Sequence, residues 1–194
     1  MEDFTGSFGD FIWMGITHIG DFEGYDHMLF LAALCAIYGV KSWKTVAALA
    51  TAFTVGHSIT LILGGMSLLS FSSEWIEFLI PVTILLTAIA NLVMAAQGSF
   101  WLRFMMCVGF GIIHGMGFSS FVRMFAGGDN LVSSLFGFNL GVELGQLAIV
   151  AAVLGLNWLV VTKANVPQNW WMRIWSIGAG LIALMLIIQK WPLG

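Results

Sequence analysis

Long apolar runs limit this chain to one class of fold. A helix needs about 20 apolar residues to cross the hydrocarbon of a bilayer. The sequence offers six such stretches, at 26–43, 45–66, 76–96, 102–123, 131–161 and 171–190. Hydrophobic residues make up 59% of the chain and charged residues only 9%, against about 25% charged in a soluble domain. The sequence therefore predicts an all-α, polytopic integral membrane helix bundle that forms a single domain over residues 1–194.

A shorter apolar stretch precedes the first of these spans. Residues 8–19, FGDFIWMGITHI, are too few to cross a bilayer alone. We therefore expect residues 1–25 to form an N-terminal interfacial or re-entrant segment. If residues 8–19 did cross with help from their neighbours, the number of spans would be seven. Cys35 and Cys107 fall inside apolar runs, which favours small buried side chains over a disulfide.

Basic residues predict the orientation of the bundle. Those that follow the first, third and fifth spans are Lys41, Lys44, Arg103, Lys163 and Arg173, whereas Arg123 and Lys190 lie on the other side. Because short basic loops stay in the cytoplasm, we expect both termini outside it. The few, scattered basic residues give no nucleic-acid footprint. The expected partner is therefore the lipid bilayer, and glycine-rich helix faces are compatible with a homo-oligomer.

Ionisable residues inside the apolar spans are the strongest functional signal. Each costs about 2.5–3.5 kcal/mol at mid-bilayer on insertion scales. All four histidines belong to this set: His18, His27, His57 and His114. At about 1.5 Å of rise per residue, the last three lie in the outer-to-middle part of the membrane, as does Glu143. The sequence therefore predicts one shared polar site, provided that these helix faces turn inward.

Smaller polar groups and carboxylates accompany the histidines. Ser58 follows the histidine of the second span, and Asn139, Glu143 and Gln146 form a stripe at i, i+4 and i+7 on one helix face. We expect Asp26 and Glu143 to offset the charge of a bound cation. Ser58, Asn139 and Gln146 would then be weak or outer ligands.

A glycine-containing segment separates His18 from the Asp26–His27 pair. On one continuous helix, His18 and His27 would point in opposite directions, since nine steps of about 100° leave 180°. The glycines between them offer a break in the helix, after which both imidazoles could face one vestibule. Asp21 and Glu23 would make its mouth electronegative and attract cations, or they are solvated loop residues.

Four motifs occur in a fixed order along positions 18 to about 146: HIGDFEGYDHMLFL, FTVGHSITL, IIHGMGFS and FNLGVELGQ. Together they resemble the HupE/UreJ family of small membrane proteins, which is known from hydrogenase and urease gene clusters and is associated with nickel transport. The resemblance implies a bacterial cytoplasmic (inner) membrane location and a functional role for the histidines and aspartate of the first motif. The spacer Ile19–Tyr25 is longer than in better-known members, so the geometry of the first histidine can differ, and so can the metal.

Three functions remain open from the sequence. The first is a divalent transition-metal transporter, with nickel, zinc, cobalt or copper as the ion and a His/carboxylate site open toward the outer side. Imidazole and carboxylate ligands suit several of these metals. The second is an intramembrane zinc-dependent hydrolase, in which three histidines and an acid hold Zn²⁺ and leave one position for water. The third is a metal-binding membrane accessory subunit. For the first function, the predicted metal ligands are His18, Asp26, His27, His57, His114 and Glu143.

Overall fold

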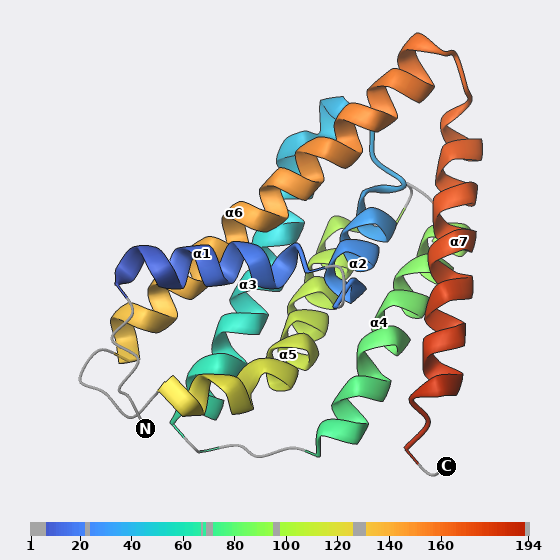
Figure 1. Cartoon of the computed structure of the whole chain (residues 1–194). Coiled ribbons are helices and arrows are strands. Elements are labelled where there is room, and N and C mark those ends of the chain that lie inside the picture. The colour runs from blue at the N-terminus through green and yellow to red at the C-terminus, as the bar shows by residue number, and fades with distance from the viewer. Residues whose placement is uncertain are drawn as a thin grey trace.

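Seven α-helices account for most of the computed structural model, which describes residues 7–21, 24–66, 68, 72–94, 98–125 and 131–192 (Figure 1). They are α1 (Phe8–Ile19), α2 (Asp26–Cys35), α3 (Trp43–Gly65), α4 (Ser73–Met94), α5 (Phe100–Phe125), α6 (Leu131–Asn157) and α7 (Gln168–Gln189). A short 3₁₀ helix, η1 (Val40–Ser42), leads into α3, and a π-helical stretch, η3 (Trp158–Lys163), extends α6. The described residues contain no strand.

Five of these helices, α3 to α7, are long and apolar enough to cross a membrane. Their bounds agree within a few residues with the predicted spans from 45–66 onward, although residues 95 and 96 lie outside the described residues. Large apolar side chains such as Ile174, Leu181 and Ile188 are exposed on the outside of the bundle. A lipid environment accounts for this apolar exterior. The prediction of an all-α helical membrane bundle is confirmed.

The helices define two ends of the bundle. At one end, which we call the terminal end, Phe8 of α1 stacks on Phe136 of α6, and Lys190 at the end of α7 lies 3.6 Å from Glu77 at the start of α4. We call the opposite end the loop end. There, residues 36–42 connect α2 to α3, and residues 164–167 connect η3 to α7. Helix α1 thus begins, and α7 finishes, at the same end (Figure 1).

The first crossing differs from the prediction, which made 26–43 one long span and 1–25 an interfacial or re-entrant segment. Helix α2 has only ten residues and covers about 15 Å. Helix α1 runs beside the terminal-end half of α6, and α2 continues to the loop end, where the Ala33 carbonyl accepts a 2.7 Å hydrogen bond from Asn91. Together, α1 and α2 reach from the terminal end to the loop end as two half-length helices, separated by the glycine-containing segment. Residues 1–6, 22 and 23 of the predicted segment lie outside the described residues.

Glycines allow the two closest helix contacts. A Cβ atom at Gly141 of α6 would overlap the carbonyl oxygen of Ile12 in α1, and one at Gly111 of α5 would overlap that of Phe53 in α3. Only glycine permits such backbone approach in a membrane bundle. Close packing on α6 therefore fixes the position of α1, which carries His18. The α3–α5 contact fixes His57 and His114 relative to each other.

Buried Arg103 joins four helices near the loop end. Its guanidinium donates a 3.0 Å hydrogen bond to the Asn91 side chain, which in turn lies 3.3 Å from the Ser176 hydroxyl and donates to Ala33. Arg103 is only 4% exposed, and a buried charge is tolerated only when it is hydrogen-bonded. This network anchors the last turn of α2 to α4, α5 and α7.

Candidate metal centre

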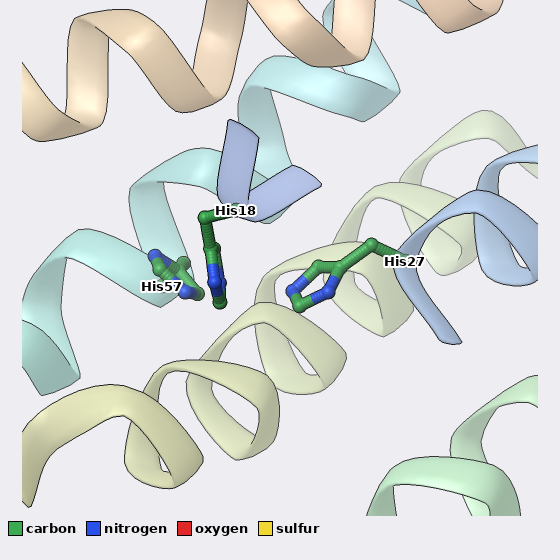
Figure 2. A group of neighbouring side chains, drawn as sticks. All are labelled: His18, His27 and His57. Carbon is green, nitrogen blue, oxygen red and sulfur yellow. The ribbon is translucent and has the colours of Figure 1, made fainter. Parts of the chain in front are cut away.

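The break between α1 and α2 brings two histidines together. His18 lies in the last turn of α1 and His27 in the first turn of α2. Their ring centroids are 4.8 Å apart, and Figure 2 shows both rings directed into one space with His57 of α3. The predicted break is confirmed, because a continuous helix would have pointed these side chains apart.

The other two histidines complete the cluster from α3 and α5. His57 lies 6.0 Å from His18 and 6.2 Å from His27, measured between ring centroids. His114 lies 5.1 Å from His27. Counted along the helices, His57 and His114 sit about 12 Å and about 16 Å from the terminal-end limits of α3 and α5. All four imidazoles therefore meet inside the membrane-spanning region, nearer its terminal end than its loop end.

Three of these imidazoles are buried, His18 is partly buried, and most of their nitrogens have no hydrogen-bond partner. His57 is 0% exposed, His114 2% and His27 6%. The nitrogens without a partner are His18 Nε2, His27 Nδ1 and Nε2, His57 Nδ1 and Nε2, and His114 Nδ1. Asn139 lies beside His57, but its amide bonds to Leu135 and Ser58 instead. A buried polar group without a partner costs about 1–3 kcal/mol, and a cation bound among these nitrogens would remove that cost.

Asp26 adds one carboxylate to the cluster. It occupies the first turn of α2, where the helix dipole favours a negative charge. Its Oδ1 accepts a 2.8 Å hydrogen bond from the His27 backbone and lies 3.0 Å from His27 Nδ1, without hydrogen-bond geometry to the ring. The last carbonyls of α1 face the same break and favour a cation. The cluster thus combines neutral nitrogen donors with one negative oxygen donor.

Two overlapping sets of side chains lie close enough together to hold a metal ion. In one set, His18, His27 and His57 place a ligand atom each within 4.8 Å of the others, and Asp26, His27 and His114 do the same in the second. Imidazole and carboxylate are the usual ligands of Ni²⁺, Co²⁺, Zn²⁺ and Cu²⁺ in such mixed sites. Five of the six predicted metal ligands are therefore brought together.

Glu143, the sixth predicted ligand, lies in a separate polar strip between α3 and α6. Its carboxylate accepts hydrogen bonds of 2.6 Å from both Thr51 and Thr54. Gln146, predicted as an outer ligand, lies 3.1 Å from the Thr54 hydroxyl. Among the described residues, Glu143 belongs to neither set of metal-binding geometry. The stripe predicted on α6 therefore exists, and it faces the threonines of α3.

Ser58 and Asn139, the other predicted outer ligands, also bind each other across this interface. The Ser58 hydroxyl lies 2.7 Å from both the Asn139 side-chain oxygen and the Thr54 carbonyl. The one hydroxyl hydrogen of Ser58 is donated to one of these acceptors or shared between them. Of the acidic residues predicted at the mouth, Asp21 is exposed and Glu23 lies outside the described residues.

We expect the replacement of Glu143 by glutamine to leave the bound metal unchanged. Glutamine retains an acceptor for one threonine and can donate to the other, and the histidine cluster is untouched. The measurement is the metal content of the purified variant by elemental analysis, beside wild type and His27→Ala, which removes the one residue that both ligand sets share. A loss of metal as large as that in His27→Ala would make Glu143 a ligand, as the sequence predicts.

Thr83 of α4 fixes the orientation and tautomer of His114. Its hydroxyl donates a 2.7 Å hydrogen bond to the Ile80 carbonyl and lies 3.0 Å from His114 Nε2. With its one hydrogen given to Ile80, the hydroxyl accepts from His114, so Nε2 carries the proton and Nδ1 presents its lone pair. In the sequence, Thr83 is a polar residue inside the predicted span 76–96, and no pattern there identifies His114 as its partner. Such outer contacts orient metal-binding histidines.

Replacing Thr83 by valine is expected to weaken metal affinity about tenfold, whereas Thr83→Ser retains it, because only serine keeps the hydroxyl acceptor. The affinity is measured by Co²⁺ titration of each purified variant. Histidine ¹⁵N spectra provide a second readout, since loss of the acceptor changes the tautomer population of His114. Equal affinities and equal spectra for the valine and serine variants would contradict this role for Thr83.

The fold and the cluster together define a class: a multi-pass helical membrane protein with histidines and an aspartate gathered inside the helix bundle. A family model described as HupE / UreJ protein matches residues 2–193, and the chain belongs to the HupE/UreJ family. The family resemblance seen in the motifs is thereby confirmed over nearly the whole length. No curated protein and no solved structure matches the chain.

Proposed function

We propose that this protein carries a divalent transition-metal ion across the bacterial cytoplasmic membrane, with nickel as the ion that the family implies. The observation that carries the proposal is the set of buried imidazole nitrogens without partners inside the helix bundle. Six such nitrogens converge there with one carboxylate. Ionisable groups are costly inside a membrane, and those that occur there commonly mark an ion path or a proton relay.

The break between α1 and α2 favours movement of the ion over permanent storage. The cluster lies where α1 ends and α2 begins, and these half-helices run toward opposite ends of the bundle. Discontinuous helices surround the ion sites of many secondary transporters, since their ends supply dipoles and free backbone groups. His18 is only partly buried, whereas the other three histidines are buried. This difference supports entry of the ion from the α1 side, at the terminal end.

Flux into vesicles is the direct test of transport. The purified protein is reconstituted into liposomes that contain a metal-sensitive dye, and Ni²⁺ or Co²⁺ is added outside. We expect uptake by wild type and by Val55→Ala, a lipid-exposed control on α3, and none by His57→Ala. An ion that survives chelator treatment in the purified protein, with no flux in vesicles, would support the hydrolase or accessory-subunit alternatives instead.

The basic residues support a terminal end outside the cytoplasm. Lys41, Lys44 and Lys163 lie at the loop end and are exposed or half-buried, as the predicted orientation requires. Single cysteines introduced at Ser73 and Asn169 test this orientation, because both positions are exposed and lie at opposite ends. The native cysteines are buried and provide a low background.

We expect a membrane-impermeant maleimide to label Ser73→Cys in intact spheroplasts, from outside the cytoplasmic membrane. Asn169→Cys should react only after the membrane is opened. Labelling is read by a mass shift on a gel, with wild type as the background control. The reverse pattern would place the terminal end in the cytoplasm.

A further inference from the structure

The ligand residues form two overlapping groups, and no single group among the described residues contains all five. The first group, called subsite A, consists of His18, His27 and His57. The second, called subsite B, consists of Asp26, His27 and His114. The two subsites share only His27, which extends between them from the first turn of α2.

His27 presents one ring nitrogen to each subsite. Both of its ring nitrogens are buried without a hydrogen-bond partner. Nδ1 lies 3.0 Å from Asp26 Oδ1, on the side of subsite B. The other nitrogen points toward His18 and His57, on the side of subsite A (Figure 2). A neutral imidazole has a lone pair on only one nitrogen at a time, so His27 can serve one subsite or the other. When the ion passes from A to B, Nδ1 releases the proton that it carried while the ion was in A, and the other nitrogen takes up a proton, so the net charge of the cluster does not change.

We propose that subsites A and B are alternative positions of one ion, which passes from A to B on the two nitrogens of His27. This inference rests on the proposed function and specifies how the ion moves through the cluster. Subsite A has three nitrogen donors, whereas subsite B has two nitrogens and a carboxylate oxygen. Of the two His114 nitrogens, Nδ1 has no hydrogen-bond partner and is the donor that B would use, since Nε2 lies 3.0 Å from the Thr83 hydroxyl.

The two subsites also lie against different helices. Subsite A lies between α1 and α3, and His18 and His57 both lie near Phe138 of α6. Subsite B lies between α2 and α5 and contacts α4 through Thr83. An ion that moves from A to B keeps His27 of α2 as a ligand and exchanges His18 and His57 for Asp26 and His114. It thereby moves away from α1 and toward the helix, α2, that continues to the loop end. The passage requires no movement of one helix relative to another.

Cobalt binding to single-subsite variants tests the proposal. The variants are His57→Asn, which removes a ligand of A only, His114→Asn, which removes one of B only, and His27→Asn, which affects both. Met105→Ala on α5, a lipid-exposed position, is the matched control. Each full-length protein is titrated with Co²⁺ in detergent. Bound cobalt is counted by equilibrium dialysis, and its visible absorption reports the ligand set.

We expect one Co²⁺ per chain in wild type and in Met105→Ala. His57→Asn and His114→Asn should each retain one Co²⁺, bound about tenfold more weakly. Their absorption spectra should differ from each other, since the remaining donors are two nitrogens and an oxygen in one and three nitrogens in the other. His27→Asn should bind none.

Two outcomes would overturn the inference. If either single-subsite variant loses cobalt as completely as His27→Asn, the histidines form one indivisible site. If wild type holds two Co²⁺ per chain, the subsites are filled together and no hand-over occurs. Circular dichroism and a single symmetric elution peak establish that each variant is folded.

Flux measurements separate this inference from the proposed function. In vesicles, each single-subsite variant should bind the ion but lose at least about tenfold of the Co²⁺ flux. Wild-type flux together with one indivisible site would retain the transport function and reject the two subsites. Two separable subsites without any wild-type flux would retain the two subsites and reject the transport function.

Discussion

Replacing His27 with alanine is expected to remove metal binding and flux altogether, the largest single effect in this protein. His27 is the one residue in both ligand sets, so neither set keeps three donors without it. Loss of an outer contact to a metal ligand already costs about 10–100-fold in affinity, and loss of a shared ligand costs more. Metal content and vesicle flux are measured together, so that binding and movement are both scored.

The neighbouring variant Met28→Ala is the control for His27→Ala, since it changes the same helical turn but leaves the cluster intact. Both variants should elute as the wild type does and retain its helical content. Metal binding at wild-type affinity in folded His27→Ala would remove the cluster from the function altogether.

A valine at Gly141 is expected to detach α1 from α6 and to weaken metal binding by about tenfold or more. The added Cβ would overlap the backbone of Ile12 and Gly15, and overpacked sites of this kind cost about 1–3 kcal/mol or more. Helix α1 packs mainly on α6, so the five long helices should stay assembled while His18 leaves the cluster. The variant should therefore behave as His18→Ala does, and its thermal midpoint in detergent should fall by several degrees.

Gly155→Val is the matched control, because it makes the same change on the same helix. A Cβ at Gly155 has nothing within 4 Å, so metal affinity and thermal midpoint should remain those of wild type. Equal losses in the two variants would mean that valine disturbs α6 itself rather than its contact with α1.

The sequence predicted the depth of the site because depth depends on local geometry. Once 45–66 and 102–123 are helices, a fixed rise per residue places His57 and His114 at similar heights. The same reasoning predicted that the segment after His18 breaks the helix, since glycine carries its conformational preference wherever it lies. These features needed no knowledge of neighbouring helices.

Features that depend on a partner helix were beyond the sequence. Residues 8–19 are too short to cross alone, and only the glycine face of α6 shows where α1 docks. Glu143 lies on the predicted polar stripe, but the stripe could have turned toward the histidines as well as toward Thr51 and Thr54. The role of Thr83 likewise depends on α5 lying beside α4. Periodicity identifies a polar face and leaves its partner undefined.

The cluster contains every histidine of the chain. Any signal selective for imidazole therefore originates at this one centre in the untagged protein, without a background from other histidines. Selective isotope labelling of histidine would give magnetic resonance spectra with only four side chains to assign, recorded in a native bilayer and without mutation. The binding and release of the ion, and the protonation of each imidazole, could then be followed in the same sample during turnover.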